Sequence, residues 1–137
     1  MTAKEYLGQA HYLDIRINSK LNELTELRSL AMKVTSAYGT APHTSTPDNR
    51  RLEKVLARIV DLEKEIDNDI DKFVDLKREI KKVIDEVKDE KYKALLEMRY
   101  LNQMTWEQIA VKLGYDSRHI RRMHGWALQK IKISEIF

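Results

Sequence analysis

The stretch that decides the fold is residues 105–131, TWEQIAVKLGYDSRHIRRMHGWALQKI. Thr105 is a suitable N-cap, and Gln108 lies three residues later, where its side chain can complete a capping box. Gly114 falls where the chain must reverse, a place that often requires a left-handed backbone and therefore favours glycine. Asp116 can then cap a second helix. This spacing predicts two short helices joined by a tight turn, which is a helix-turn-helix arrangement.

The expected second helix has one apolar face and one basic face. On a helical wheel the apolar face holds Ile120, Met123, Ala127 and Ile131. The opposite face holds Arg118, Arg122, Gly125 and Gln129, with Arg121 on its flank. No acidic residue follows Asp116 in this helix. Because the second helix of such a motif enters the major groove and arginine suits guanine edges and phosphates, the pattern predicts binding to double-stranded DNA.

Gly125 is an unusual residue for the middle of a helix, where glycine costs roughly 1 kcal/mol relative to alanine. Its missing side chain would let the backbone approach a phosphate in line with Arg118 and Arg122. The glycine would otherwise be merely tolerated, or mark a bend. The sequence leaves both interpretations open.

Four short motifs carry a resemblance to a known family. They are Met98-Arg99-Tyr100, WEQIA at 106–110, SRHIR at 117–121 and ALQKI at 127–131. Together they make the last third of the chain similar to region 4 of the bacterial sigma-70 family, which recognises the promoter −35 element. The resemblance implies base contacts by Ser117, Arg118 and Arg122. The DNA-backbone contacts that we expect beside them are Thr105, His119, Arg121 and Lys130.

The sequence also departs from that family. Many sigma factors have an acidic residue where Arg118 stands and a glutamine where Arg122 stands, so we do not expect the preferred site to be an ordinary −35 box. In size the chain looks like the small sigma-region-4-like proteins of phages and prophages of Gram-positive bacteria, which resemble regulators of late transcription. The resemblance therefore implies a sequence-specific transcription regulator that recruits or blocks RNA polymerase at promoters.

The first two thirds of the chain predict a long antiparallel helical hairpin. Apolar residues recur at three- and four-residue steps from about Thr2 to Ala37, and again in a heptad-like seam from Pro47 to about Lys88. The stretch 39–49, GTAPHTSTPDN, is the expected loop. The second seam is expected to break near Asp69, where Ile70 would take over the apolar position.

These patterns predict an all-α fold with two parts. Residues 1–88 would form the coiled-coil-like hairpin, and residues 89–137 would form the helix-turn-helix domain, with a third helix over 91–101 bracing the motif. A lone pair of amphipathic helices leaves apolar surface uncovered. We therefore expect either packing of the hairpin on the C-terminal domain or self-association, as a homodimer or higher oligomer through the hairpin. A dimer would also suit a DNA site made of two half-sites.

The distribution of charge agrees with this division. The net charge is +3, and from Asp89 onward nine basic residues face six acidic ones, while the rest of the chain holds sixteen of each. All of the excess positive charge therefore lies with the expected DNA-binding half. The chain has no cysteine and no apolar stretch long enough for a membrane span or signal peptide, which indicates a cytoplasmic protein without membrane contact.

Enzyme, metal and cofactor chemistry find no support in the sequence. The four histidines lack ligand spacing, and neither a glycine-rich phosphate loop nor a nucleophile elbow is present. The alternating Asp67, Asp69 and Asp71 resemble the start of an EF-hand loop, but Lys72 and Arg78 stand where the motif needs glycine and glutamate. We expect a solvated acidic face there.

Two other functions remain possible on the sequence alone. Small terminase subunits, which act as adaptors in phage DNA packaging, also join a helix-turn-helix to helical oligomerisation segments. Alternatively, a sigma-like fold could bind polymerase or another regulator as a protein-interaction module and no longer contact DNA. The three arginines at 118, 121 and 122 weigh against that last interpretation.

Overall fold

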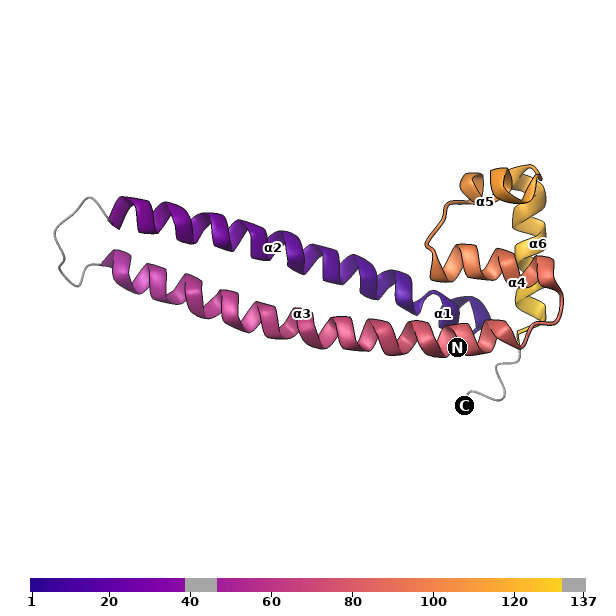
Figure 1. Cartoon of the computed structure of the whole chain (residues 1–137), viewed down its shortest axis with the longest axis horizontal. Coiled ribbons are helices and arrows are strands. Elements are labelled where there is room, and N and C mark those ends of the chain that lie inside the picture. Colours follow the sequence, from indigo (N-terminus) through magenta and orange to yellow (C-terminus); the bar gives the residue numbers. More distant parts are fainter. Residues whose placement is uncertain (39–46, 132–137) are drawn as a thin grey trace. The chain divides into compact units, whose positions relative to one another are not determined.

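The computed structural model describes residues 1–38 and 47–131, and over both ranges it is all-α, without a strand. No helix within them is long and apolar enough to cross a membrane. The elements, drawn in Figure 1, are α1 (Ala3–Leu7), α2 (Gln9–Tyr38), α3 (Pro47–Asp85), α4 (Glu90–Leu96), the π-helix η1 (Glu97–Leu101), α5 (Trp106–Leu113) and α6 (Ser117–Gln129).

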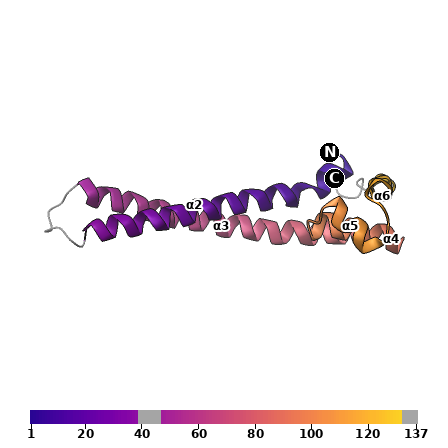
Figure 2. The same ribbon diagram turned by 90° about the horizontal axis from the view of Figure 1, so that it is seen from above.

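Residues 15–72 form one unit, the hairpin unit, in which α2 and α3 run antiparallel and side by side (Figures 1 and 2). Its main buried cluster consists of Leu24, Val55, Ile59, Leu62 and Ile66, with Leu27 and Ala31 packed against them, and Ile17 is buried as well. The predicted antiparallel hairpin is therefore confirmed. Most of the predicted loop, 39–46, lies outside the described residues, and Pro47 begins α3 as its fixed φ favours.

The apolar seam of the hairpin contains one polar layer. Asp69 continues the three- and four-residue spacing of the buried positions on α3, and its carboxylate accepts a hydrogen bond from the Lys20 ammonium of α2 at 2.6 Å. That hydrogen bond, more than the burial that opposes it, lowers the pKa of Asp69. The prediction that Ile70 replaces Asp69 in the seam was wrong, because Lys20 supplies a partner that allows the carboxylate to be buried while Ile70 stays exposed. The solvated acidic face is limited to Asp67 and Asp71.

The second unit, here called the helix-turn-helix unit, joins the two ends of the described chain. It consists of residues 1–14 together with the chain from Phe73 onward. Its buried core draws on α1, the start of α2, the end of α3 and all of the later helices: Tyr6, Leu7, Ala10, Ile80, Ile84, Val87, Leu95, Leu96, Tyr100, Ile109, Ala110, Ile120, Met123, Ala127 and Ile131.

The division into these two units differs from the expected domain boundary at residue 88. The sequence pattern assigned residues 1–88 to the hairpin, whereas the structure divides the chain within α2 and within α3. The physical reason is that Leu7, Ile80 and Ile84 are fully buried in the same core as the helix-turn-helix. The expected single helix from Thr2 is also interrupted at Gly8, which ends α1.

The local signals around the motif are confirmed. Thr105 and Gln108 form the capping box at the start of α5, and the Asp116 side chain accepts a hydrogen bond from the His119 backbone N–H at 2.7 Å. Gly114 has φ 78°, the left-handed conformation that glycine adopts without strain. The bracing helix differs from expectation, because its second half, Glu97–Leu101, is the π-helix η1.

Candidate nucleic-acid interface

The two faces of α6 are distributed as the sequence predicted. Its buried positions include Ile120, Met123 and Ala127, which pack into the core of the helix-turn-helix unit. Arg118, Arg121, Arg122, Gly125 and Gln129 are all exposed. The structure thus places three guanidinium groups on one helix, directed away from the core and available to a ligand outside the molecule.

The arginines of α6 have few partners in the described part of the chain. Arg121 lies 3.9 Å from a carboxylate oxygen of Glu107 on α5, and both side chains are exposed. An exposed pair at that distance contributes little to stability and is easily exchanged for another anion. Within residues 1–38 and 47–131, Arg118 and Arg122 form no ion pair. Both are therefore positioned to bind an external anion.

The other expected contacts occupy different parts of the motif. Ser117 is the first residue of α6 and is partly exposed. His119, in the first turn, lies between two aromatic rings, with centroids 4.8 Å from Tyr115 and 6.3 Å from Trp126. These contacts hold the imidazole beside Tyr115 and Trp126.

Thr105 and Lys130 are less favourably placed than the residues of the first turns of α6. The Thr105 hydroxyl oxygen already accepts the Gln108 N–H in the capping box, at 3.2 Å. Lys130 is the C-cap of α6, twelve residues beyond Arg118, or about 18 Å along the helix. The structure therefore does not group Lys130 with the arginines at the start of α6.

A buried polar cluster packs against the core side of α6, and it was not predicted from the sequence. The Tyr100 hydroxyl shares a hydrogen bond with Nε2 of His124, which is buried on the core side of the helix. The indole of Trp106 packs edge-on against the imidazole at 4.7 Å, and the Arg99 guanidinium stacks over that indole at 4.1 Å. Burial lowers the pKa of His124 to about 4, with Arg99 and Lys4 adding to the shift, so this histidine is neutral at neutral pH.

The same burial raises the pKa of Tyr100 to about 12. The phenol therefore keeps its proton beside the neutral imidazole, so the hydrogen bond joins two uncharged groups. This polar contact links η1 to the helix that carries the arginines. The sequence signal for the burial of His124 was its spacing, because a residue four after Ile120 and three before Ala127 lies on the apolar face of the helix.

Gly125 has no internal role that requires glycine. It is exposed within a continuous helix, and a Cβ built on it would meet no atom within 4 Å. Packing within the described part of the molecule therefore does not explain the missing side chain. The interpretation in which the backbone approaches an external phosphate keeps its physical basis.

Comparison with known proteins gives one match. The model of a family described as a protein of unknown function, DUF1492, matches residues 33–132, which is well over half of the chain. The chain belongs to the DUF1492 family. The DUF1492 match extends from the last residues of α2 through α3 and all the helices of the motif, so both units contain part of it. Neither a curated protein nor a solved structure matched the chain.

Proposed function

We propose that this protein is a sequence-specific, DNA-binding transcription regulator of the phage or prophage type. The observation that carries the proposal is the basic face of α6, on which Arg118, Arg121 and Arg122 are exposed and no acidic side chain occurs. The left-handed turn at Gly114 and the two helix caps support it, because they fix the angle between α5 and α6 that a helix-turn-helix needs.

In this proposal the residues of α6 have two different roles. Arg118 and Arg122, with Ser117, would contact base edges in the major groove, where arginine binds guanine through two hydrogen bonds. Arg121 and His119 would contact phosphates, with Thr105 and Lys130 as outlying backbone contacts. Phosphate contacts fix the register of the protein and base contacts provide specificity.

The similarity of residues 93–131 to sigma-70 region 4 supports a place at promoters. In this proposal the protein acts in the bacterial cytoplasm by recruiting RNA polymerase or by blocking its access, and no enzymatic activity, metal or cofactor forms part of it.

Self-association through the hairpin unit completes the proposal. Leu56, Val60 and Ile70 are exposed on one side of α3, away from the buried seam. Residues 50–88 hold eleven acidic and eleven basic side chains, so this stretch carries no net charge and a second copy could approach it without net repulsion. Two copies would present two α6 helices to two half-sites.

The test is a selection of bound fragments from sheared bacterial and phage DNA at near-physiological salt. The intact protein is compared with Arg118→Ala/Arg122→Ala, and with Arg51→Ala/Arg78→Ala as a control that removes the same charge from exposed positions of α3. We expect one sequence to be enriched by the intact protein and by the control, but not by the α6 variant. On the selected site, Arg122→Ala alone should cost about 1–3 kcal/mol.

Other outcomes would favour other functions. Equal loss of binding in both double variants would mean that net charge, not the face of α6, holds the DNA. No enrichment by any of the proteins would contradict DNA binding and leave the protein-interaction module. A closed ring of many subunits, found by light scattering, would favour the packaging adaptor over the regulator.

A further inference from the structure

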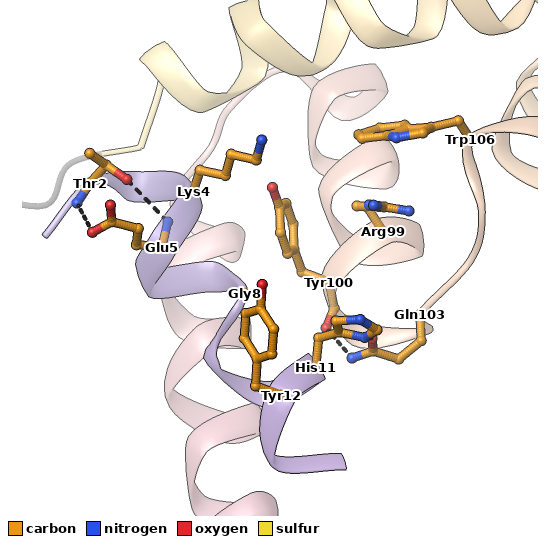
Figure 3. Close-up of a pocket in the computed structure, with 10 residues that line it drawn as sticks. All are labelled: Thr2, Lys4, Glu5, Gly8, His11, Tyr12, Arg99, Tyr100, Gln103 and Trp106. Carbon is orange, nitrogen blue, oxygen red and sulfur yellow. Dashed lines mark hydrogen bonds between the residues drawn. The ribbon is translucent and has the colours of Figure 1, made fainter. Parts of the chain in front are cut away.

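The helix-turn-helix unit contains a cavity of about 490 Å³. It lies between the N-terminal segment and the stretch that leads into α5, as Figure 3 shows. The residues that line it are Thr2, Lys4, Glu5, Gly8, His11, Tyr12, Arg99, Tyr100, Gln103 and Trp106. Its volume is in the range of pockets that hold small molecules, roughly 300–1,000 Å³.

Three departures from regular backbone meet at this cavity. Arg99 and Tyr100 belong to the π-helix η1, a rare element that is frequent at functional sites. Gln103 has φ 58°, the only positive φ at a non-glycine residue in the described part of the chain. Gly8 interrupts the N-terminal helix, where an added Cβ would lie 3.1 Å from the Lys4 carbonyl oxygen. Strained or unusual backbone of this kind is retained where the surroundings require it, and such places are often ligand sites.

Hydrogen bonds hold the wall of the cavity in position. Nδ1 of His11 donates to the Gln103 side-chain oxygen at 2.8 Å, and the Gln103 amide nitrogen donates to the Tyr100 carbonyl at 3.3 Å. These bonds connect the start of α2 to the end of η1. The wall of the cavity is thus held in a defined geometry by hydrogen bonds, one of which joins residues 92 positions apart in the sequence.

The charges around the cavity are mostly positive and unpaired. Lys4 and Arg99 form no ion pair within residues 1–38 and 47–131. Glu5, the acidic residue of the wall, accepts a hydrogen bond from the Thr2 backbone N–H at 3.2 Å. Arg99 is half-buried, and one of its nitrogens donates to the Met104 carbonyl at 3.0 Å. A half-buried guanidinium without a carboxylate partner is suited to binding an anion.

Aromatic side chains supply the remaining surface. In Figure 3 the Arg99 guanidinium lies against the Trp106 ring, while the Tyr12 and Tyr100 rings face the same space from another side. Tyr12 is 69% exposed, so most of its ring is accessible to a ligand. A planar ring could pack against these groups while its acidic substituent met Arg99 and Lys4.

We propose that this cavity binds a small planar anion, a ring that carries a carboxylate or a phosphate. Arg99 provides the directed contact to the anion, and Lys4 adds a second positive charge. Tyr12 and Trp106 hold the ring. Trp106 is also the first residue of α5, so a ligand in the cavity would contact α5 directly. The hydroxyl of Tyr100 contacts His124, so the same ligand would be linked to α6 through Tyr100.

The test measures binding in the absence of DNA, so its result does not depend on the proposed function. The full chain with Trp126→Phe keeps Trp106 as its single tryptophan and reports on the cavity by fluorescence. The carboxylate probes are benzoate and indole-3-acetate, and the phosphate probe is adenosine monophosphate. Benzamide and adenosine serve as the uncharged counterparts. Titration calorimetry on the unmodified protein gives the affinities.

We expect one of the anionic classes to bind and to change the Trp106 fluorescence, with its uncharged counterpart much weaker. The class that binds identifies the carboxylate or the phosphate as the natural group. Arg99→Gln should weaken binding about tenfold or more, and Lys4→Gln severalfold, because charge-assisted hydrogen bonds are lost. Lys82→Gln, at an exposed position of α3, should change nothing.

Lys4→Gln and Tyr12→Ala keep the test decisive if Arg99→Gln fails to fold, since Lys4 and Tyr12 are exposed. Absence of binding by every anionic probe would overturn the proposal. So would binding that is undiminished in both the Lys4→Gln and Tyr12→Ala variants, because the probe would then occupy another site.

Discussion

The two units are built from the same kind of element and are stabilised in different ways. In the hairpin unit the buried side chains form a single seam between two helices. Ion pairs such as Arg58–Glu23 at 3.2 Å and Arg28–Glu63 at 3.3 Å link the exposed flanks. In the helix-turn-helix unit, short helices surround a core that is covered on several sides and includes residues from both ends of the described chain.

The difference shows what each unit needs from the sequence. A two-helix seam needs only the spacing of its apolar residues, and exposed ion pairs add little to its stability. A core assembled from separated segments needs each segment to be present and correctly oriented. The helix-turn-helix unit should therefore be the more sensitive of the two to single substitutions.

The largest effect on stability should come from a charge introduced at a buried position of α3, tested in two separate variants. Leu62 and Ile80 of α3 are both fully buried, but Leu62 belongs to the hairpin core and Ile80 to the helix-turn-helix core. Ile80→Asp should destabilise the helix-turn-helix unit by more than about 3 kcal/mol, because it buries an unpaired carboxylate. Trp106 and Trp126 fluorescence would follow this unit during denaturation.

Leu62→Asp is the matched variant for that experiment. It should lower the helicity of the hairpin while the tryptophan signal of the other unit remains near that of the intact protein. If both substitutions unfolded both units together, the two units would be one cooperative structure and the comparison would fail.

Lowering the pH from 7 to 5 should destabilise the helix-turn-helix unit through His124. Burial lowers the pKa of His124 to about 4, whereas an unfolded histidine titrates near 6.5. The unfolded state therefore takes up the proton first, and the free energy of unfolding should fall as the pH drops from about 6.5 toward 4. By pH 5 the loss should be about 1–2 kcal/mol.

His124→Gln provides the reference for that measurement, because it removes this titration and leaves the other ionisable groups in place. Denaturation curves of both proteins at pH 7 and pH 5 give the difference that belongs to His124. Equal pH dependence in the two proteins would contradict the assignment of the shift to this residue.

The Lys20–Asp69 pair of the hairpin should give a smaller change in stability, and the change should differ between loss of one partner and replacement of both. Asp69→Ala leaves the Lys20 ammonium without its partner and should cost on the order of 1 kcal/mol, since Lys20 is partly exposed and can regain water. Lys20→Met/Asp69→Leu replaces the pair with apolar groups and should be neutral or stabilising. Thermal unfolding followed by circular dichroism measures both, and a double variant less stable than Asp69→Ala would contradict the prediction.

The smallest effect concerns Gly125. Gly125→Ala should raise the stability of the helix-turn-helix unit by roughly 0.5–1 kcal/mol, because the site is helical and a methyl group meets no neighbour. If the backbone at this position approaches a phosphate, the same variant should bind DNA more weakly despite its greater stability. A stabilised variant with unchanged DNA affinity would show that the glycine is only tolerated.

Much of this structure could be predicted from local patterns. The caps at Thr105 and Asp116, the turn at Gly114 and the start of α3 at Pro47 each depend on a few neighbouring residues. The exposed arginines of α6 followed from helical periodicity, and so did the hairpin. Their contacts with DNA remain predictions.

The features that the sequence did not predict depend on contacts between distant segments. The burial of Asp69 requires Lys20, 49 residues earlier, and the boundary of the units depends on Leu7 meeting the core around Ile80 and Ile109. The cavity requires a π-turn at Arg99 and a left-handed Gln103, and neither has a local sequence signature. Periodicity reports which face of a helix is buried, but it does not report the partner that buries it.

The sequence of the hairpin unit is inserted within that of the helix-turn-helix unit, which has a consequence for folding during synthesis. The hairpin, residues 15–72, lies between the two parts of the helix-turn-helix unit. On a ribosome the hairpin can pair as soon as α3 has emerged, whereas Tyr6 and Leu7 must wait for α4 to α6 before they are covered. The early pairing of α2 with α3 shortens the effective distance between the waiting segments, since it replaces a long flexible connection by a folded one. Early formation of the hairpin would thus make it easier for the first residues of the chain to meet the helices that are synthesised last.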